Sequence, residues 1–245
     1  MADIENTPLF RKLSAFVALS EAEISVLKEL YKRRRTFPAD GRDLIHQGQS
    51  DQAIYILDSG WVCSYKILPD GSRQIVDFQI PGDFLGMRSA LFRTSDHSVE
   101  PITEIEVTEV VVADLLGAFE RTPRLATAVL WAASRDEAMV VEHLVGIGRR
   151  GAEERIAHFM LELGARLSLV GLGSKAGFAC PLTQYLLADA LGLSAVHVNR
   201  VLRRLRERGL LTIRGGHVTF DNYDRLIAFA DFDSAYLDQN GPLLK

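Results

Sequence analysis

The sequence has few of the residues that build disulfide frameworks and metal sites. Its two cysteines, Cys63 and Cys180, are far apart, so we expect neither a disulfide framework nor a zinc site. It has no apolar run of about 18 residues and no N-terminal segment of the secretory type, which predicts a cytoplasmic protein without a membrane partner. The remaining composition, 47% apolar and 24% charged, is typical of a globular chain with one large or two modest domains.

The net charge of −4 argues against a nucleic-acid partner only if it is evenly spread, and it is not. Residues 1–148 hold 15 basic and 22 acidic side chains, a net of −7, whereas residues 149–245 hold 13 basic and 10 acidic, a net of +3. The basic residues of 195–217 are Arg200, Arg203, Arg204, Arg206, Arg208 and Arg214, with Glu207 as the one acid. This asymmetry predicts two domains with different partners, although a solvated arginine-rich helix remains the alternative.

Apolar periodicity divides the first half of the chain into a helical and a β region. The first 35 residues have helical character, and Ser20 with Glu23 matches a capping box. From about 35 to 114 the chain shows short runs of period two with turn residues every 8–12 positions. Regular short strands of this kind predict a β-sandwich or barrel.

A long helix is predicted over 115–146. Its apolar residues recur at spacings of three and four: Val129, Leu130, Ala133, Val140, Val141 and Leu144. This stripe packs either against its own domain or against a second copy in a two-stranded coiled coil. A hinge is predicted at 146–151, followed by a helix over 152–169, and we divide the chain into domains 1–115, 116–148 and 149–245.

Residues 183–205 have the pattern of a helix-turn-helix. Ala188 is small where the helices approach, Gly192 supplies a positive φ for the turn, and Val198 fills the angle between the helices. Ser194 stands where an N-cap of the second helix belongs. Two short strand patterns around Gly215–Gly216 then predict a hairpin, so the module is expected to be winged.

The polar face of the second helix and its surroundings predict contacts with double-stranded DNA. Side chains that reach base edges in the major groove are expected to be Val196, Asn199 and Arg200. Phosphate contacts are assigned to Thr183, Gln184, Ser194, His197, Arg203, Arg204 and Arg214. The alternative class is a ligand-binding or protein-interaction module that does not bind DNA specifically. No nucleophile–base or facial-triad arrangement stands out, so an enzyme is not expected.

Over roughly residues 20–225 the chain resembles the Crp/Fnr family of bacterial transcription regulators. The matching residues in the first half are Ile45, Gly48, Asp51, 55–57, 59–60, 70–71 and 81–86, and in the second half 182–184, Ala188, 192–194, Val198, 200–202 and Leu205. The resemblance implies an α+β chain: an N-terminal β-jelly-roll of the cyclic-nucleotide-binding type, a long dimerisation helix and a C-terminal winged helix-turn-helix. It also implies a homodimer on a near-palindromic operator, with RNA polymerase as a further partner.

The sequence departs from the family where its nucleotide-binding members hold their ligand. The effector pocket implied by the resemblance is Gly86, Met87, His97, Ser98, Val140 and Val141. Met87 stands where those members place a glutamate for the ribose, and His97-Ser98 where they place an Arg-Ser pair for the cyclic phosphate. Because a neutral His is a poor substitute for a guanidinium, cyclic AMP is not expected as the effector, which stays unknown.

Other sensors of the family find little support in the sequence. The N-terminal cysteine cluster of the iron–sulfur members is missing. Haem would need ligands such as His46, His97 or His143, each of which we interpret as a surface or structural residue. No cofactor is therefore predicted, and a redox role of Cys63 or Cys180 stays open. The residues after Ser194 also differ from those of the cyclic-AMP receptor, so a different half-site is expected.

Overall fold

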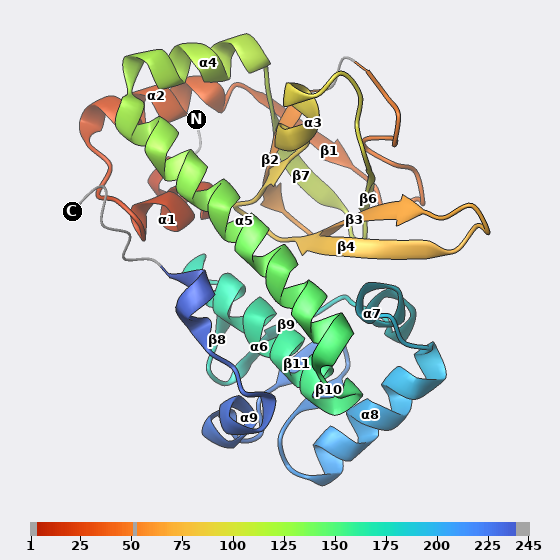
Figure 1. Cartoon of the computed structure of the whole chain (residues 1–245). Helices are drawn as coiled ribbons and strands as arrows, with labels where there is room; N and C mark the ends of the chain where they lie inside the picture. Colours follow the sequence, from red (N-terminus) through yellow and green to blue (C-terminus); the bar gives the residue numbers. More distant parts are fainter. Residues whose placement is uncertain (1–3, 51–52, 239–245) are drawn as a thin grey trace. The chain divides into compact units, whose positions relative to one another are not determined.

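The computed structural model describes residues 4–50 and 53–238 (Figure 1). Within these ranges the chain forms two compact units. The first holds the residues up to Ile67 together with Val76–Ser134, and the second holds Leu68–Ile75 and Arg135–Asp238. None of the described helices has the length and apolar character needed to cross a bilayer. The predicted α+β architecture is confirmed, with a β-rich unit followed by a helix-rich one.

The N-terminal segment begins with η1 (Ile4–Asn6), α1 (Pro8–Ser14) and α2 (Glu21–Leu30). The predicted capping box is confirmed, because the Ser20 N–H donates to Glu23 Oε2 at 2.6 Å. The helical region is shorter than predicted, since β1 (Arg33–Phe37) starts before residue 35. Its arginines pair with β7 across the sheet, and Arg35 lies 2.6 Å from Glu109, so tertiary pairing overrides their helix propensity.

The first unit contains the predicted short strands. They are β2 (Ile54–Ser59), β3 (Val62–Ile67), β4 (Arg73–Gln79), β5 (Phe84–Leu85), β6 (Ser98–Pro101) and β7 (Ile105–Val110), and the residues of β4 up to Ile75 are the exception that belongs to the second unit. They form two sheets, β1-β7-β2-β5 and β4-β3-β6. A short helix that the sequence did not predict, α3 (Met87–Leu91), lies between β5 and β6. The pattern of period two therefore indicated the strands but not this insertion.

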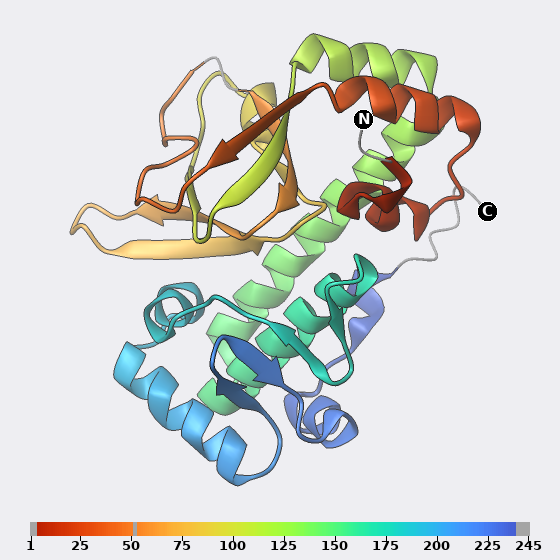
Figure 2. The same ribbon diagram turned by 180° about the vertical axis from the view of Figure 1, so that it is seen from behind.

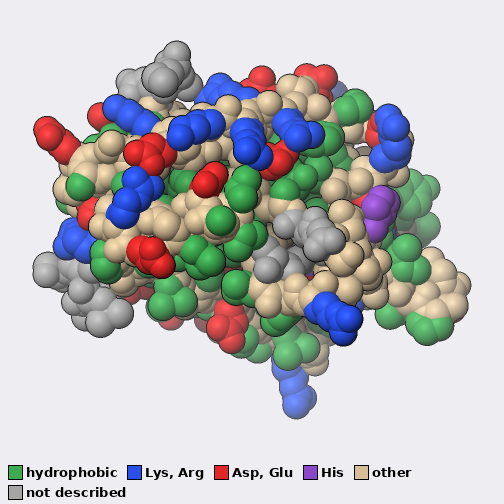
Figure 3. All heavy atoms as spheres, turned by 90° about the horizontal axis from the view of Figure 1, so that it is seen from above, with side chains coloured by type: hydrophobic (Ala, Val, Ile, Leu, Met, Phe, Trp, Pro, Cys, Tyr) green, Lys and Arg blue, Asp and Glu red, His purple; other side chains and the backbone are tan. Residues whose placement is uncertain are grey.

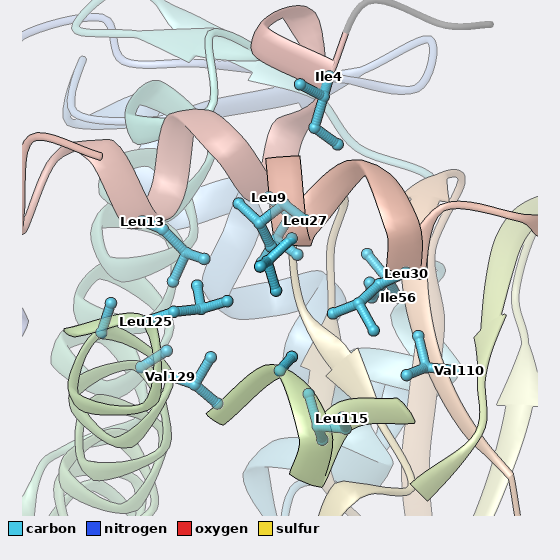
Figure 4. Packing of buried hydrophobic residues seen from close by; sticks show 14 of the residues in the cluster. Ile4, Leu9, Leu13, Leu27, Leu30, Ile56, Val110, Leu115, Leu125 and Val129 are labelled. Carbon is cyan, nitrogen blue, oxygen red and sulfur yellow. The ribbon is translucent and has the colours of Figure 1, made fainter. Parts of the chain in front are cut away.

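The interior of the first unit is mostly apolar. One cluster joins the N-terminal helices to the helices that follow β7, with Leu9, Leu13 and Leu27 facing Leu125 and Val129 (Figure 4). The surface is different: on the face seen from above, Lys and Arg side chains form a row with Asp and Glu side chains beside them (Figure 3). The acidic net charge of this half therefore does not make a uniformly acidic surface.

The predicted long helix is divided in two. α4 (Val112–Arg121) ends before Thr122, and α5 (Pro123–Arg149) begins at a proline, which suits a first helical position because it has no N–H to satisfy. α5 continues through Gly146 and Gly148, and the chain leaves the helical conformation only before α6 (Ala152–Leu169). The non-helical break between α5 and α6 is limited to residues 150–151, and its role as a hinge and the domain boundaries remain predictions.

The second unit contains the predicted helix-turn-helix and wing. Its further elements are β8 (Gly173–Ser174), β9 (Gly177–Ala179), α7 (Gln184–Leu191), α8 (Ala195–Glu207), β10 (Thr212–Arg214), β11 (His217–Thr219), α9 (Tyr223–Ala230) and η2 (Ser234–Leu237). The wing belongs to a four-stranded sheet of order β10-β11-β9-β8, which is larger than the predicted hairpin (Figure 2). The Gly-Gly turn is confirmed by φ values of 58° and 72° at Gly215 and Gly216.

Candidate functional site

The turn between α7 and α8 sets the direction of the second helix. Gly192 has a φ of 64°, as the sequence predicted, and Val198 is fully buried in the angle between the helices. Ser194 caps α8 by accepting a hydrogen bond from the His197 N–H at 3.2 Å. Thr183 caps α7 in the same way through the Leu186 N–H at 3.2 Å. Local chemistry therefore fixes both helix starts.

The three predicted base-reading side chains lie exposed on one stretch of α8. Val196 is 67% exposed, although Val198 two positions later is fully buried, and Asn199 and Arg200 are also exposed. Within the described part of the chain no hydrogen bond or ion pair occupies the Arg200 guanidinium. The Asn199 amide donates to Gln184 Oε1 at 3.1 Å, so a predicted base contact and a predicted phosphate contact are joined across the turn.

The predicted phosphate contacts fall into two groups. Thr183, Gln184, Ser194 and Arg214 are exposed and His197 is half-buried. Arg203 and Arg204 are exposed but already paired: Arg203 Nε lies 2.7 Å from Glu207 Oε1, and Arg204 Nη1 lies 3.0 Å from Glu153 Oε1. A phosphate would have to compete with these carboxylates. Among the predicted contacts on α8, Arg200 is therefore the arginine whose guanidinium has no partner within the described residues.

Glu153 is a residue that the sequence reasoning missed. It lies near the start of α6 and accepts from Arg204 and from Arg208, the second at 2.9 Å. The hydrogen bond from Arg204, together with the charges of both arginines, lowers the pKa of Glu153. No sequence signal connects these residues, because more than fifty positions separate them. The pairs tie the second half of α8 to α6.

Tyr185 is the second missed residue. Its side chain is 75% exposed at the start of α7, next to Thr183 and Gln184. A phenolic hydroxyl on the outer face of the first helix is a suitable donor to a phosphate oxygen. Its place two residues after the N-cap Thr183 was the signal that would have identified it.

Arg155 connects the end of α5 to the helix-turn-helix within the second unit. Its guanidinium donates to three main-chain carbonyls: Leu191 at 2.7 Å, Ile147 at 3.0 Å and Arg150 at 3.0 Å. Two of these belong to the last turn of α5 and the residue after it, and Leu191 is the last residue of α7. Burial lowers the pKa of Arg155. One side chain therefore satisfies carbonyls at two helix C-termini.

The predicted pocket residues of the sensor fall in both units. Gly86, Met87, His97 and Ser98 lie in the first unit, where His97 is 8% exposed, Ser98 is buried and Met87 packs partly buried on the apolar cluster. Arg88, which follows Met87, places its Nη2 atom 3.2 Å from His97 Nδ1. Val140 and Val141 belong to the second unit and are exposed on α5. Among the described residues no group of three or more His, Cys, Asp and Glu side chains is arranged to hold a metal ion.

Two family models match the chain, one in each half. A cyclic nucleotide-binding domain matches residues 35–129, and a Crp-like helix-turn-helix domain matches residues 154–229. The first covers most of the β-rich region and α4, and the second covers α6 through most of α9.

Several relatives match over nearly the whole length. The nitrogen fixation regulation protein FixK of Bradyrhizobium diazoefficiens is 31% identical over 87% of this chain and 88% of its own. The fumarate and nitrate reduction regulatory protein of Vibrio cholerae is 26% identical over 86% of this chain and 84% of its own. The solved structure of FixK2 from Bradyrhizobium japonicum superposes with a TM-score of 0.71 at 27% identity, covering 80% of this chain and 96% of that one. With this likeness and the helix-turn-helix geometry, the chain belongs to the Crp/Fnr family of DNA-binding transcription regulators.

Proposed function

We propose that this protein acts in the cytoplasm as a homodimer that binds a near-palindromic operator and regulates transcription by RNA polymerase. The observation that carries the DNA-binding part is the outer face of α8. There Val196, Asn199 and Arg200 are exposed together, directly after a capped helix start.

The residue types on this face suit the major groove. A guanidinium forms a bidentate pair with guanine O6 and N7, and a valine methyl contacts a thymine methyl. Since Asn199 is held by Gln184, it is presented in one orientation rather than sampling several. Thr183, Tyr185 and Gln184 stand exposed at the start of α7, where the first helix of such a module crosses the phosphate backbone.

The homodimer rests on an unpartnered apolar stripe of α5. The exposed positions Leu130, Ala133, Glu137, Val140, Leu144 and Ile147 follow one another at alternating spacings of three and four. This is the a/d spacing of a two-stranded coiled coil, and Glu137 is its one charged member. A second copy of the same helix is the occupant that such a repeat fits, because two-fold pairing buries the stripe against itself. Two recognition helices would then read half-sites about 34 Å apart.

Selection from random duplexes tests the DNA-binding proposal. The full chain is expected to enrich a near-palindromic site, and binding is expected to weaken steeply with salt, as phosphate contacts require. Arg200→Ala should relax one symmetric base position at a cost of about 1–3 kcal/mol. Arg206→Ala, an exposed arginine farther along the same helix, serves as the control and should keep the preference. Absent or salt-independent DNA binding would instead favour a protein-interaction module.

Sedimentation tests the homodimer separately. The wild-type chain should sediment as a dimer, and Leu144→Glu should sediment as a monomer, because it places a second charge in the stripe. Leu116→Glu changes an exposed leucine of α4 outside the stripe and should leave the dimer intact. A wild-type monomer at micromolar concentration would contradict the proposed dimer. It would not contradict the proposed DNA contacts of α7 and α8.

A further inference from the structure

The sensor unit does not offer the groups that an anionic nucleotide needs. A cyclic phosphate requires a cationic side chain and donors without competing partners. The polar side chains at the predicted pocket, His97 and Ser98, both have partners within the chain, and so does the neighbouring Arg88. The residues present therefore do not fit a cyclic nucleotide, although the matching domain model is named for one.

Asp96 is the partner of both His97 and Arg88. Its Oδ1 lies 2.7 Å from His97 Nδ1, and its Oδ2 lies 3.1 Å from Arg88 Nη2. Lys66 Nζ adds a weaker contact at 3.8 Å. Burial works to raise the pKa of Asp96, but the hydrogen bond with His97 and the charge of Arg88 outweigh it and lower the pKa. The carboxylate is therefore ionised. It pairs at the same time with Arg88 of α3 and with His97, the residue before β6.

The segment that carries Asp96 is held on its other side by hydrogen bonds to residues 47–49. The Gly48 N–H donates to the Ser95 carbonyl at 2.7 Å, and the Ser95 N–H donates to the Gln49 carbonyl at 2.9 Å. Ser98 Oγ accepts from the Gln47 N–H at 3.1 Å. The hydroxyl in the place implied for phosphate binding is thus used in holding two loops together.

Apolar side chains fill the space beneath these loops. A cluster from both sheets and the loop before β2 is almost completely shielded from solvent: Ile45, Leu57, Val62, Leu85, Val99, Ile105 and Val107. Gly86, beside this cluster, is so closely packed that a Cβ atom there would lie 2.8 Å from Ile45 Cδ1. A base and ribose would have to displace this packing.

We propose that the Asp96 carboxylate acts as a built-in replacement for an anionic effector. With Arg88 and His97 it forms an internal clasp that holds α3 to the start of β6 and leaves the unit unresponsive to cyclic nucleotides. The first unit then keeps one conformation whether or not a cyclic nucleotide is present. A signal that changes this conformation must act by something other than nucleotide binding in the β-roll.

Calorimetric titration of the full wild-type chain with cyclic AMP, cyclic GMP and inorganic phosphate tests whether Asp96 takes the place of an anionic ligand. No saturable binding is expected at millimolar concentrations. Asp96→Asn, which removes the charge and keeps the size, should gain binding of inorganic phosphate through the released Arg88 and His97. Saturable binding of either cyclic nucleotide by the wild-type chain, or equal phosphate binding by both chains, would overturn the proposal.

Hydrogen exchange tests the clasp itself. Arg88→Asp and Asp96→Arg should each speed amide exchange across residues 87–98 by about two- to fivefold, the range expected for a partly exposed ion pair. The double variant Arg88→Asp/Asp96→Arg should restore protection because it reverses both charges. Arg93→Asp, an exposed arginine of the same segment, is the matched control. Unchanged exchange in both single variants would overturn the clasp, and neither experiment depends on DNA binding.

Discussion

The two candidate binding regions, one in each unit, differ in whether their side chains have partners within the chain. In the first unit, Arg88, His97 and Ser98 are all satisfied from within the chain. In the second unit, the start of α8 presents Val196 and Arg200 to solvent without a partner among the described residues. Unsatisfied polar groups on a rigid, capped helix indicate where an external ligand binds, and a fully satisfied set indicates a structural role.

The largest expected effect is on the free energy of unfolding, from a substitution that destabilises the second unit alone. Val198→Asp buries an unpaired charge in the angle of the helix-turn-helix and should lower the free energy of unfolding of the second unit by about 4 kcal/mol or more. Both tryptophans, Trp61 and Trp131, lie in the first unit. In denaturant titrations, circular dichroism should therefore shift while tryptophan fluorescence keeps its midpoint.

The control for this variant is Val196→Asp. It adds the same charge two positions earlier, on the exposed face of α8, and should change stability by less than about 0.5 kcal/mol. If Val198→Asp shifts the fluorescence midpoint as far as the circular dichroism midpoint, the two units unfold as one and the comparison fails.

A smaller effect is expected from Arg155. Arg155→Met keeps much of the packing but leaves the Leu191, Ile147 and Arg150 carbonyls without their donor, which should cost about 2 kcal/mol. Arg149, six positions earlier and exposed at the end of α5, provides the control Arg149→Met. A positioning role predicts that Arg155→Met also weakens operator binding at a temperature where both variants are folded. Unchanged operator affinity would leave Arg155 a purely structural residue.

Cys180 tests whether the second unit carries a reactive thiol. Burial raises the pKa of Cys180 to about 11, so at pH 8 its thiolate fraction is about a hundredfold below that of an ordinary cysteine. Iodoacetamide labelling, followed by peptide mass spectrometry, should be slower by at least that factor. The rate should rise with each pH unit toward 11 and become ordinary in denaturant. Fast labelling of the folded chain at pH 8 would restore the redox hypothesis.

The smallest effect is expected at Glu153. Glu153→Gln releases Arg204 and Arg208 at a stability cost of no more than about 1 kcal/mol, since the arginines are largely exposed. The released guanidiniums should strengthen binding to nonspecific duplex and steepen its salt dependence by up to about one unit per arginine. Glu207→Gln, which releases only Arg203, gives the matched comparison. An unchanged salt slope would show that releasing these arginines adds no phosphate contact.

Much of the candidate site was predictable because its determinants are local. The Ser194 cap, the positive φ of Gly192 and the buried Val198 all lie within seven positions, and each depends on one side chain and its neighbours in the sequence. The strands of the first unit were predictable for the same reason. The assignment of individual residues to bases and phosphates stays a prediction.

The sequence by itself determined which helix presents arginines, where it starts and how it turns, since caps, turns and apolar spacing act over a few residues. Only the tertiary structure decided which charges are already in use. Arg204 and Asp96 look equally available in the sequence, yet one is paired with Glu153 on another helix and the other with Arg88 on α3. Ion pairs form between side chains that folding brings within about 4 Å, and no local pattern encodes that distance.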